Sequence, residues 1–297
     1  MKMKRFLKLI RHKKSTIGLA LGSGGAKVLA HIGVIKALVE NNISIDFITG
    51  SSIGALIGAY YAIYEDVGKM EKIALSTNWR TALSLFDPSL SGGLVRGNKV
   101  ENLIKSWFNK YNFDDLKIPL TVVATDLISG QEVDINNGDI IKAVRASISI
   151  PLIFKPIEYN DYLLADGGLS NPLPDDIARR MGADIVIAVN LDNKFFDSKL
   201  DQYNLSISGA GARALNIIRY HFAQHSSKSG DIIIEPEVKE VGFVGWNKFF
   251  NSRESKEIIR MGEVATTEVL PQIKKLIKEK EEEGGILGFV KKLKKRY

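Results

Sequence analysis

The feature that most constrains the fold is the alternation of short apolar runs with segments whose apolar residues have helical spacing. Runs rich in Ile, Val and Leu recur from residue 16 to residue 238, and helical patterns separate most of them. Strand–helix–strand order predicts an α/β fold with a mainly parallel sheet, because parallel neighbours need a crossover that places helices on both faces. We expect strands at 16–21, 43–48, 120–127, 133–135, 162–165, 184–191 and 231–238, and helices near 29–40, from 54, and near 139–147, 174–181 and 208–224.

Charge divides the chain into a long body and two basic ends. Residues 1–14 contain seven Lys or Arg and no acid, and residues 291–297 contain five more, which leaves 29 basic and 34 acidic side chains elsewhere. We predict an N-terminal arm at 1–14, a folded domain at 15–270, and a C-terminal helix with a basic tail at 271–297. Residues 193–207 are polar and unpatterned, and we predict a loop there.

Both basic ends have the pattern of amphipathic helices. Apolar residues recur at i, i+3, i+4 and i+7, at Met3, Phe6, Leu7 and Ile10 and at Ile286, Phe289, Val290 and Leu293. A basic helix with an apolar stripe tends to lie in a membrane interface, so we expect residues 1–14 and 285–297 to bind an anionic membrane surface. The alternative is that both helices pack on the domain. Nucleic acid is not an expected partner, because aromatic interleaving and a base-reading motif are missing.

The same sequence argues against insertion into a membrane. No stretch has the roughly 18 apolar residues that a membrane-spanning helix needs. Lys8 and Arg11 interrupt the apolar residues near the N-terminus, so a signal peptide is not expected. The expected location is the cytoplasm, peripheral on the inner membrane face. The chain has no cysteine, which excludes disulfides, thiolate metal ligands and a cysteine nucleophile.

The stretch DFITGSSIGALIGAYYA contains the spacing G-x-S-x-G, with Ser52 between Gly50 and Gly54. A short apolar run precedes Ser52 and a helix-like apolar run follows it, so the serine falls at a predicted strand-to-helix turn. Glycine on either side permits a sharp turn and the close approach of other segments. This context favours a nucleophile, and the alternative is that Ser51 or Ser52 caps the following helix.

A serine nucleophile also needs donors for the oxyanion that forms during attack. The glycine-rich turn GSGGAK follows the predicted strand at 16–21, and such a turn presents backbone N–H groups. A dinucleotide loop is disfavoured, because Gly22 and Gly24 are followed by Lys27 where the third glycine of G-x-G-x-x-G belongs. We predict that the N–H groups of Gly24, Gly25 and Ala26 form an oxyanion hole and that Lys27 adds positive charge.

The base that would activate Ser52 has two sets of candidates. Among the histidines, His31 follows the glycine turn and has the place of a packed or capping residue. His221 and His225 come after Asp166, in the order Ser…Asp…His of α/β-hydrolases, so a triad is one possibility.

Asp166 is itself the other candidate base. It follows the apolar run 162–165 and precedes Gly167 and Gly168, although D-G-G is also a common turn. Since Ser52, the glycine turn and Asp166 all follow predicted strands, we expect them together at the carboxyl edge of the sheet.

Four motifs in this order, GSGGAK…HIGVIKAL, GSSIGALIGA, RASISIPLIFKPI and ADGGLSNPLP, resemble the patatin-like phospholipase family, particularly its short bacterial members. The resemblance covers about residues 15–190 in motifs and extends to 270 in overall shape. It implies a three-layer α/β/α fold and a Ser–Asp dyad. Carried onto this chain, it makes Ser52 the nucleophile and Asp166 the general base, with Gly24, Gly25 and neighbouring amides as the oxyanion hole.

One position departs from the family pattern: Val28 stands where a glycine usually follows the basic residue, which Lys27 matches. A Cβ at this position is expected to crowd the loop or to restrict its backbone angles. The alternative function that follows is a membrane-bound regulatory or scaffold protein with little turnover.

The preferred interpretation is a serine hydrolase of membrane lipid esters. No cofactor is expected, and no group of carboxylates or histidines has metal-ligand spacing, so the predicted hydrolysis is metal-independent. Segments 84–95 and 148–154 are candidate walls of an acyl channel.

Overall fold

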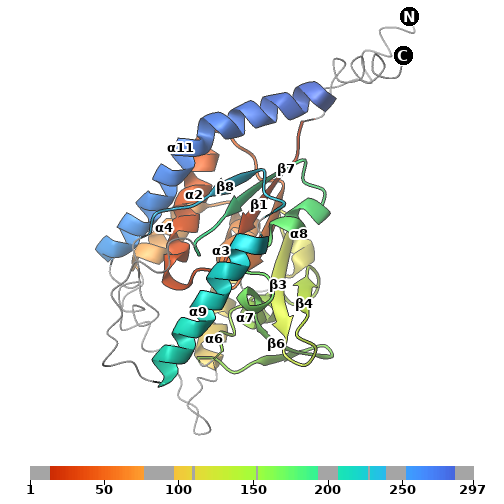
Figure 1. Ribbon diagram of the computed structural model, residues 1–297, viewed down its shortest axis with the longest axis vertical. Coiled ribbons are helices and arrows are strands. Elements are labelled where there is room, and N and C mark those ends of the chain that lie inside the picture. Colours follow the sequence, from red (N-terminus) through yellow and green to blue (C-terminus); the bar gives the residue numbers. More distant parts are fainter. Residues whose placement is uncertain are drawn as a thin grey trace, which may run out of the picture.

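The computed structural model describes residues 14–76, 97–108, 111–151, 153–192, 207–226, 228–238 and 252–284, and shows helices on both faces of one sheet (Figure 1). In the described residues the sheet has eight strands in the order β5-β6-β3-β2-β1-β7-β8, with β4 also paired to β3. The neighbouring strands β3, β2, β1, β7 and β8 are parallel to one another. Strands β4 and β6 both pair antiparallel with β3, and β5 pairs antiparallel with β6. The strands are β1 (Ile17–Leu21), β2 (Phe47–Ser51), β3 (Leu120–Asp126), β4 (Glu132–Ile135), β5 (Ile157–Tyr159), β6 (Tyr162–Asp166), β7 (Ile185–Val189) and β8 (Ile232–Ile234).

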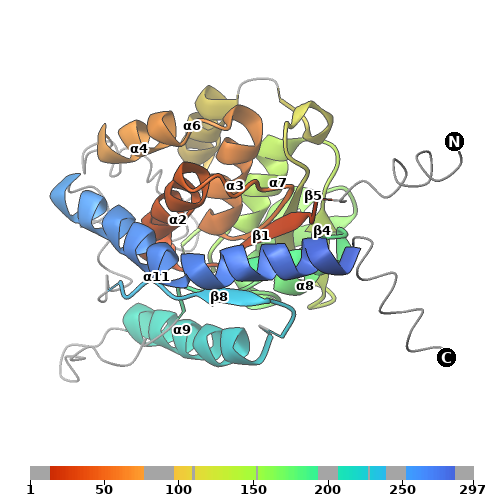
Figure 2. The same cartoon turned by 90° about the horizontal axis from the view of Figure 1, so that it is seen from above.

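Helices cover the sheet in an α/β/α arrangement (Figure 2). One face carries Leu19, Leu21 and Ile48, which belong to the main apolar core with residues of α2 and α3. The other face has small side chains, and a Cβ on Gly18 would lie 2.8 Å from Ala183 Cβ beside α8. The helices are α2 (Leu29–Glu40), α3 (Ile53–Tyr64), α4 (Val67–Ser76), α6 (Asn98–Phe108), α7 (Ile140–Ser147), α8 (Asp175–Arg180), α9 (Ile207–Ser226) and α11 (Ser252–Gly284), with 3-10 turns η1 (Gly25–Val28), η2 (Phe113–Asp115) and η3 (Gly167–Leu169).

Helix α11 packs along α2 at a contact made by two glycines. A Cβ on Gly33 would lie 1.9 Å from the Ile259 carbonyl oxygen, and a Cβ on Gly262 would lie 2.0 Å from the Ala30 carbonyl oxygen. The two backbones therefore approach more closely than any larger residue would allow. The predicted domain boundary at residue 270 falls inside α11, which continues through Pro271 to Gly284.

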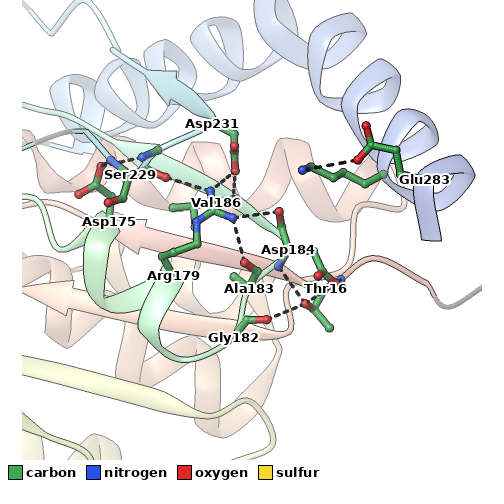
Figure 3. A network of polar contacts seen from close by, with 12 residues as sticks. Thr16, Asp175, Arg179, Gly182, Ala183, Asp184, Val186, Ser229, Asp231 and Glu283 are labelled. Atoms are coloured by element: carbon green, nitrogen blue, oxygen red, sulfur yellow. Dashed lines mark hydrogen bonds and ion pairs between the residues drawn. The ribbon is translucent and has the colours of Figure 1, made fainter. Parts of the chain in front are cut away.

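A polar network at the amino end of β1 and β7 joins α8 to the β8 edge of the sheet (Figure 3). Arg179 Nη1 donates to the carbonyl oxygens of Ala183 and Asp184, both at 2.9 Å. Its Nη2 lies 2.5 Å from Asp231 Oδ2, which also accepts the Val186 N–H. One guanidinium thus connects the end of α8 with the segment that enters β8.

The predicted α/β fold with helices on both faces of the sheet is confirmed, and most predicted strands and helices in the described residues lie within a few residues of their expected positions. Three bounds differ more: β2 begins at Phe47 rather than 43, β8 ends at Ile234 rather than 238, and α11 begins at Ser252 rather than 271. The structure adds β5, α4 and α6, which the sequence patterns did not predict. The loop at 193–206, residues 1–13, the tail at 285–297 and the candidate wall at 84–95 lie outside the described residues. Among the described helices, none is both long and apolar enough to span a bilayer.

Candidate active site

Ser52 lies at the turn between β2 and α3, in a backbone conformation that side chains seldom adopt. Its φ and ψ are 57° and −134°, and it immediately precedes the first residue of α3. Strain of this kind at a strand-to-helix turn is typical of a nucleophile elbow. Ser52 occupies the N-cap position, but its side chain makes no capping bond. Instead, its Oγ donates to Asp166 Oδ2 at 2.5 Å.

The glycines around Ser52 are required by close packing. A Cβ on Gly54 would lie 2.4 Å from the Leu21 carbonyl oxygen and 2.6 Å from that of Gly22, so α3 begins directly against the end of β1. A Cβ on Gly50 would lie 2.5 Å from Ala55 Cα, in the first turn of α3 itself. The G-x-S-x-G spacing therefore lets the elbow and the glycine turn after β1 lie in contact.

Asp166 reaches Ser52 because β6 is antiparallel to β3, which corrects the expectation that all site residues share the carboxyl edge of parallel strands. The register pairs Asp166 with Ala124 of β3, and the preceding residue Val123 pairs with Ser51. The carboxyl end of β6 consequently points back along β3 and ends beside the elbow. The Thr125 hydroxyl donates to the Asp166 carbonyl oxygen at 2.8 Å and fixes this position.

The Asp166 carboxylate is buried, with 4% of the residue exposed. Its Oδ1 accepts the Gly168 N–H at 2.8 Å, and its Oδ2 accepts the Ser52 hydroxyl. Burial raises the pKa of Asp166 from 3.8 to about 6, although both hydrogen bonds act in the opposite direction. The next residue, Gly167, has no room for a side chain, because a Cβ there would lie 2.2 Å from the Val123 carbonyl oxygen. The D-G-G sequence is a turn, and it also holds the carboxylate.

The glycine turn after β1 lies against the elbow and leads into the short helix η1. The Ser23 and Lys27 N–H groups are bonded to the carbonyl oxygens of Pro172 and Gly24. Gly24 is the N-cap of η1 and Gly25 and Ala26 are its first residues, so their N–H groups have no acceptor within the helix. Gly25 has φ +57°, a conformation that favours glycine.

Lys27 and Val28 are both buried at the end of this turn. The Lys27 ammonium donates to the Leu191 carbonyl oxygen, which ties the turn to the segment after β7. Val28 has φ −62° and ψ −15°, ordinary right-handed helical values, and its side chain is part of the main core. The structure therefore accommodates the Cβ at position 28 without backbone strain.

None of the three histidines in the described residues is hydrogen-bonded to Ser52 or Asp166. His31 is fully buried on α2, where its Nε2–H donates to the Gly22 carbonyl oxygen at 2.8 Å, and burial lowers its pKa to about 4. His221 and His225 are exposed on α9. In the described residues both oxygens of the Asp166 carboxylate are bonded to Ser52 and Gly168 rather than to a histidine.

Two further groups at the site were missed by the sequence analysis. The Ser147 hydroxyl accepts the Ser52 N–H at 2.9 Å, and the Ser149 carbonyl oxygen accepts the Asp166 N–H at 3.1 Å. Both serines belong to the RASISIPLIFKPI motif. The position of this motif between Ser52 and Asp166 in the sequence is the signal that could have indicated their place at the site. Arg219 and Asp192 form a second group beside Asp166, and no motif marks them. Among the described residues, no cluster of three metal-ligating side chains is present.

A strained serine elbow, a buried carboxylate in contact with it and an adjacent glycine turn on an α/β fold are the features that a serine nucleophile needs. A family model described as patatin-like phospholipase matches residues 19–179, more than half of the chain. The chain therefore belongs to the patatin-like phospholipase family.

Individual relatives agree with this assignment. An uncharacterized NTE family protein of Mycobacterium tuberculosis is 42% identical over 180 residues, which are 59% of this chain and 49% of the relative. Human patatin-like phospholipase domain-containing protein 6 is 34% identical over 203 residues, 66% of this chain and 14% of the relative. The chain thus spans about half or less of these proteins. The crystal structure of VipD from Legionella pneumophila has a TM-score of 0.58 at 14% identity, covers 87% of this chain and 67% of that one, and supports the fold.

Proposed function

We propose that this protein is a serine acyl hydrolase that cleaves ester bonds of membrane lipids, with Ser52 as nucleophile and Asp166 as general base. The observation that supports this most directly is the 2.5 Å contact between Ser52 Oγ and Asp166 Oδ2. The contact is buried, and the raised pKa of Asp166 gives the carboxylate more proton affinity than a free aspartate has.

The reaction follows from these positions in two halves. Ser52 Oγ attacks the ester carbonyl carbon while its proton passes to Asp166, and the carbonyl oxygen becomes an oxyanion. The C–O bond to the alcohol then breaks, and Asp166 returns the proton to the leaving alcohol. In the second half, Asp166 takes a proton from water as the water attacks the acyl-serine. The bond between the acyl carbon and Ser52 Oγ then breaks, Asp166 returns the proton to Ser52 Oγ, and the acid is released.

The oxyanion would form beside the glycine turn after β1. The N–H groups of Gly24, Gly25 and Ala26, which stand at the start of η1, are the proposed donors, and the start of α3 directly after Ser52 adds the positive end of a helix dipole. The Lys27 ammonium contacts the Leu191 carbonyl oxygen, so we propose that Lys27 mainly holds the turn in place.

Lipid as the substrate class is supported by two independent points. Among the relatives, the Aspergillus fumigatus protein named Lysophospholipase nte1 is 35% identical over 199 residues, 65% of this chain and 13% of that relative. The chain also exposes Leu127 and Ile128, 46% and 80% exposed, in the turn after β3. That turn lies at the edge of the sheet where β2 ends at the elbow. We propose that the cleavage is of the phospholipase A type, in which an acyl ester bond of a phospholipid is hydrolysed.

We further propose that residues 1–14 and 285–297 attach the protein to an anionic membrane surface on the cytoplasmic side. Their sequences combine apolar stripes with twelve basic residues. The described residues next to them, at the start of β1 and the end of α11, lie at the same end of the molecule (Figures 1 and 2). The two arms would therefore act on one surface together.

Hydrolysis of a soluble p-nitrophenyl ester by four variants tests the proposed mechanism. Ser52→Ala removes the nucleophile and Asp166→Asn removes the base, so each should lower kcat/KM by roughly 10³-fold or more. His221→Ala and His225→Ala are the matched controls and should retain activity.

Two results would replace this mechanism with another. Loss of activity in a histidine variant, with Asp166→Asn still active, would indicate a triad esterase. A folded wild-type protein without any hydrolysis of soluble or lipid esters would indicate the scaffold function, which the ordinary backbone geometry at Val28 does not favour.

A further inference from the structure

A buried ion pair lies next to Asp166 and takes no direct part in the proposed proton transfer. Arg219 of α9 donates from Nε and Nη2 to the two carboxylate oxygens of Asp192, at 2.9 Å each. Asp192 follows β7, and its side chain is 2% exposed, while that of Arg219 is 17% exposed. A two-point contact with so little exposure fixes both groups more firmly than a surface ion pair would.

The Arg219–Asp192 pair contacts the glycine turn and also lies beside Asp166. The Ser23 hydroxyl, in the glycine turn, donates to Asp192 Oδ2 at 3.0 Å. A Cβ built on Gly168 would lie 2.9 Å from Asp166 Oδ1, 3.1 Å from Arg219 Cδ and 3.2 Å from Ser23 Oγ. The carboxylate, the arginine stem and the serine hydroxyl therefore converge on one glycine.

We propose that Arg219 and Asp192 are positioning residues of the active site, which hold the glycine turn through Ser23 and set the electrostatic field at Asp166. Because neither group touches the reacting atoms, their effect passes through Ser23 and Asp166. This inference rests on the proposed function, since it assumes that Asp166 is the base whose ionisation limits the reaction at low pH.

The two members of the pair act on Asp166 with opposite sign. The positive charge of Arg219 lowers the pKa of Asp166, whereas the negative charge of Asp192 raises it. Two other charged side chains bond to residues next to this pair or to Asp166's backbone partner. Lys27 of η1 is bonded to the Leu191 carbonyl oxygen, and Arg145 of α7 donates to Ser149 Oγ at 2.7 Å. These groups stay unchanged when the pair is altered.

The pH dependence of kcat/KM on a soluble ester separates this electrostatic role from a purely structural one. Arg219→Gln leaves the Asp192 charge behind and should move the acid limb to higher pH by about one unit. Asp192→Asn leaves the Arg219 charge behind and should move the acid limb to lower pH. Arg219→Lys keeps the charge and should keep the acid limb near its wild-type position. Arg213→Gln, on the same helix, is the control and should not move it.

Arg219→Gln and Asp192→Asn break the same ion pair. If the pair has only a structural role, both variants should therefore change the acid limb of kcat/KM in the same way. Acid limbs that stay in place, or that move in the same direction in Arg219→Gln and Asp192→Asn, would overturn the proposal. The proposed function fails by a different result, namely a wild-type protein without hydrolysis or an Asp166→Asn variant with normal hydrolysis. The two failures are therefore distinguishable.

Discussion

At Asp166, burial and hydrogen bonding act on the pKa in opposite directions, and burial dominates. The result is a pKa of about 6, high enough to accept a serine proton and low enough to leave the carboxylate ionised near neutral pH. The hydrogen bond from Gly168 holds one oxygen, so the other is directed at Ser52. In the proposed mechanism, this environment would let an aspartate take part of the role that a histidine has in a triad.

The acid limb of the activity profile follows from this pKa. Protonated Asp166 cannot accept the serine proton, so kcat/KM for a soluble ester should rise about tenfold per pH unit below pH 6 and level off above it. Stopped-time assays between pH 4 and 8, with folding checked by circular dichroism at each pH, measure this. A midpoint near pH 4 in folded protein would contradict the raised pKa.

At the scale of elements, the closest contact between α2 and α11 depends on glycine. The backbone carbonyl oxygen of Ile259 occupies the space that a side chain on Gly33 would need. Helix α2 also follows the glycine turn directly, and its buried His31 bonds the Gly22 carbonyl oxygen. The position of α11 is therefore coupled through α2 to the turn that would hold the oxyanion.

A pair of glycine-to-alanine substitutions tests whether the fold needs the close contact between α2 and α11. Gly33→Ala forces the two backbones apart and should lower the free energy of unfolding by roughly 2–4 kcal/mol. Gly68→Ala, in α4, is the matched control: its Cβ would come no closer than 3.6 Å to another residue, and it should be neutral or stabilising by up to about 1 kcal/mol. Urea denaturation followed by circular dichroism measures both. Equal stability of the two variants would show that α11 does not need the close contact.

Some strands could be predicted from the sequence and others could not, depending on how long and how buried each strand is. Mostly apolar runs such as 120–127 and 184–191 predict β3 and β7, because strands with neighbours on both sides and helices on both faces are rich in buried apolar residues. The strand β5 has three residues and little burial, so it leaves almost no pattern. The antiparallel direction of β6 was not predicted either, since the direction of a strand is set by its neighbours and not by its own residues.

Within the candidate site, residues that lie in sequence motifs could be predicted, whereas residues placed only by tertiary contacts could not. Ser52, Asp166 and the glycines lie in recognisable motifs, and the structure brings Ser52 and Asp166 into contact across 114 positions in the sequence. Asp192 directly follows a predicted strand and Arg219 lies in a predicted helix, but no motif marks either residue as part of a site. Their contact depends on how α9 packs, which only the folded chain determines.

At the scale of the whole molecule, the start of β1 and the end of α11, which lead to the basic arms, lie at one end (Figure 1). The proposed active site follows the opposite ends of β1 and β2. Thr16, at the start of β1, bonds Asp184 before β7, whereas the glycine turn and the elbow follow the other ends of β1 and β2. The arms would therefore hold the protein at a membrane from the end remote from Ser52, and they need not take part in ester cleavage.

Deletion of residues 1–14 and 285–297 separates attachment from chemistry. The truncated protein should bind anionic vesicles more weakly, because it lacks twelve basic residues and both apolar stripes, yet should cleave a soluble ester at the wild-type rate. Co-sedimentation with anionic and with neutral vesicles at two salt concentrations measures the first effect. Undiminished binding to anionic vesicles would show that the arms have another role.

Covalent labelling of the native protein with a fluorophosphonate tests the central claim most directly. Such a probe phosphonylates an activated serine, and peptide mapping by mass spectrometry identifies the site. The account predicts an adduct on Ser52 in the wild-type protein and much slower labelling in Asp166→Asn. An unlabelled Ser52 in folded protein, or an adduct on a different serine, would contradict it.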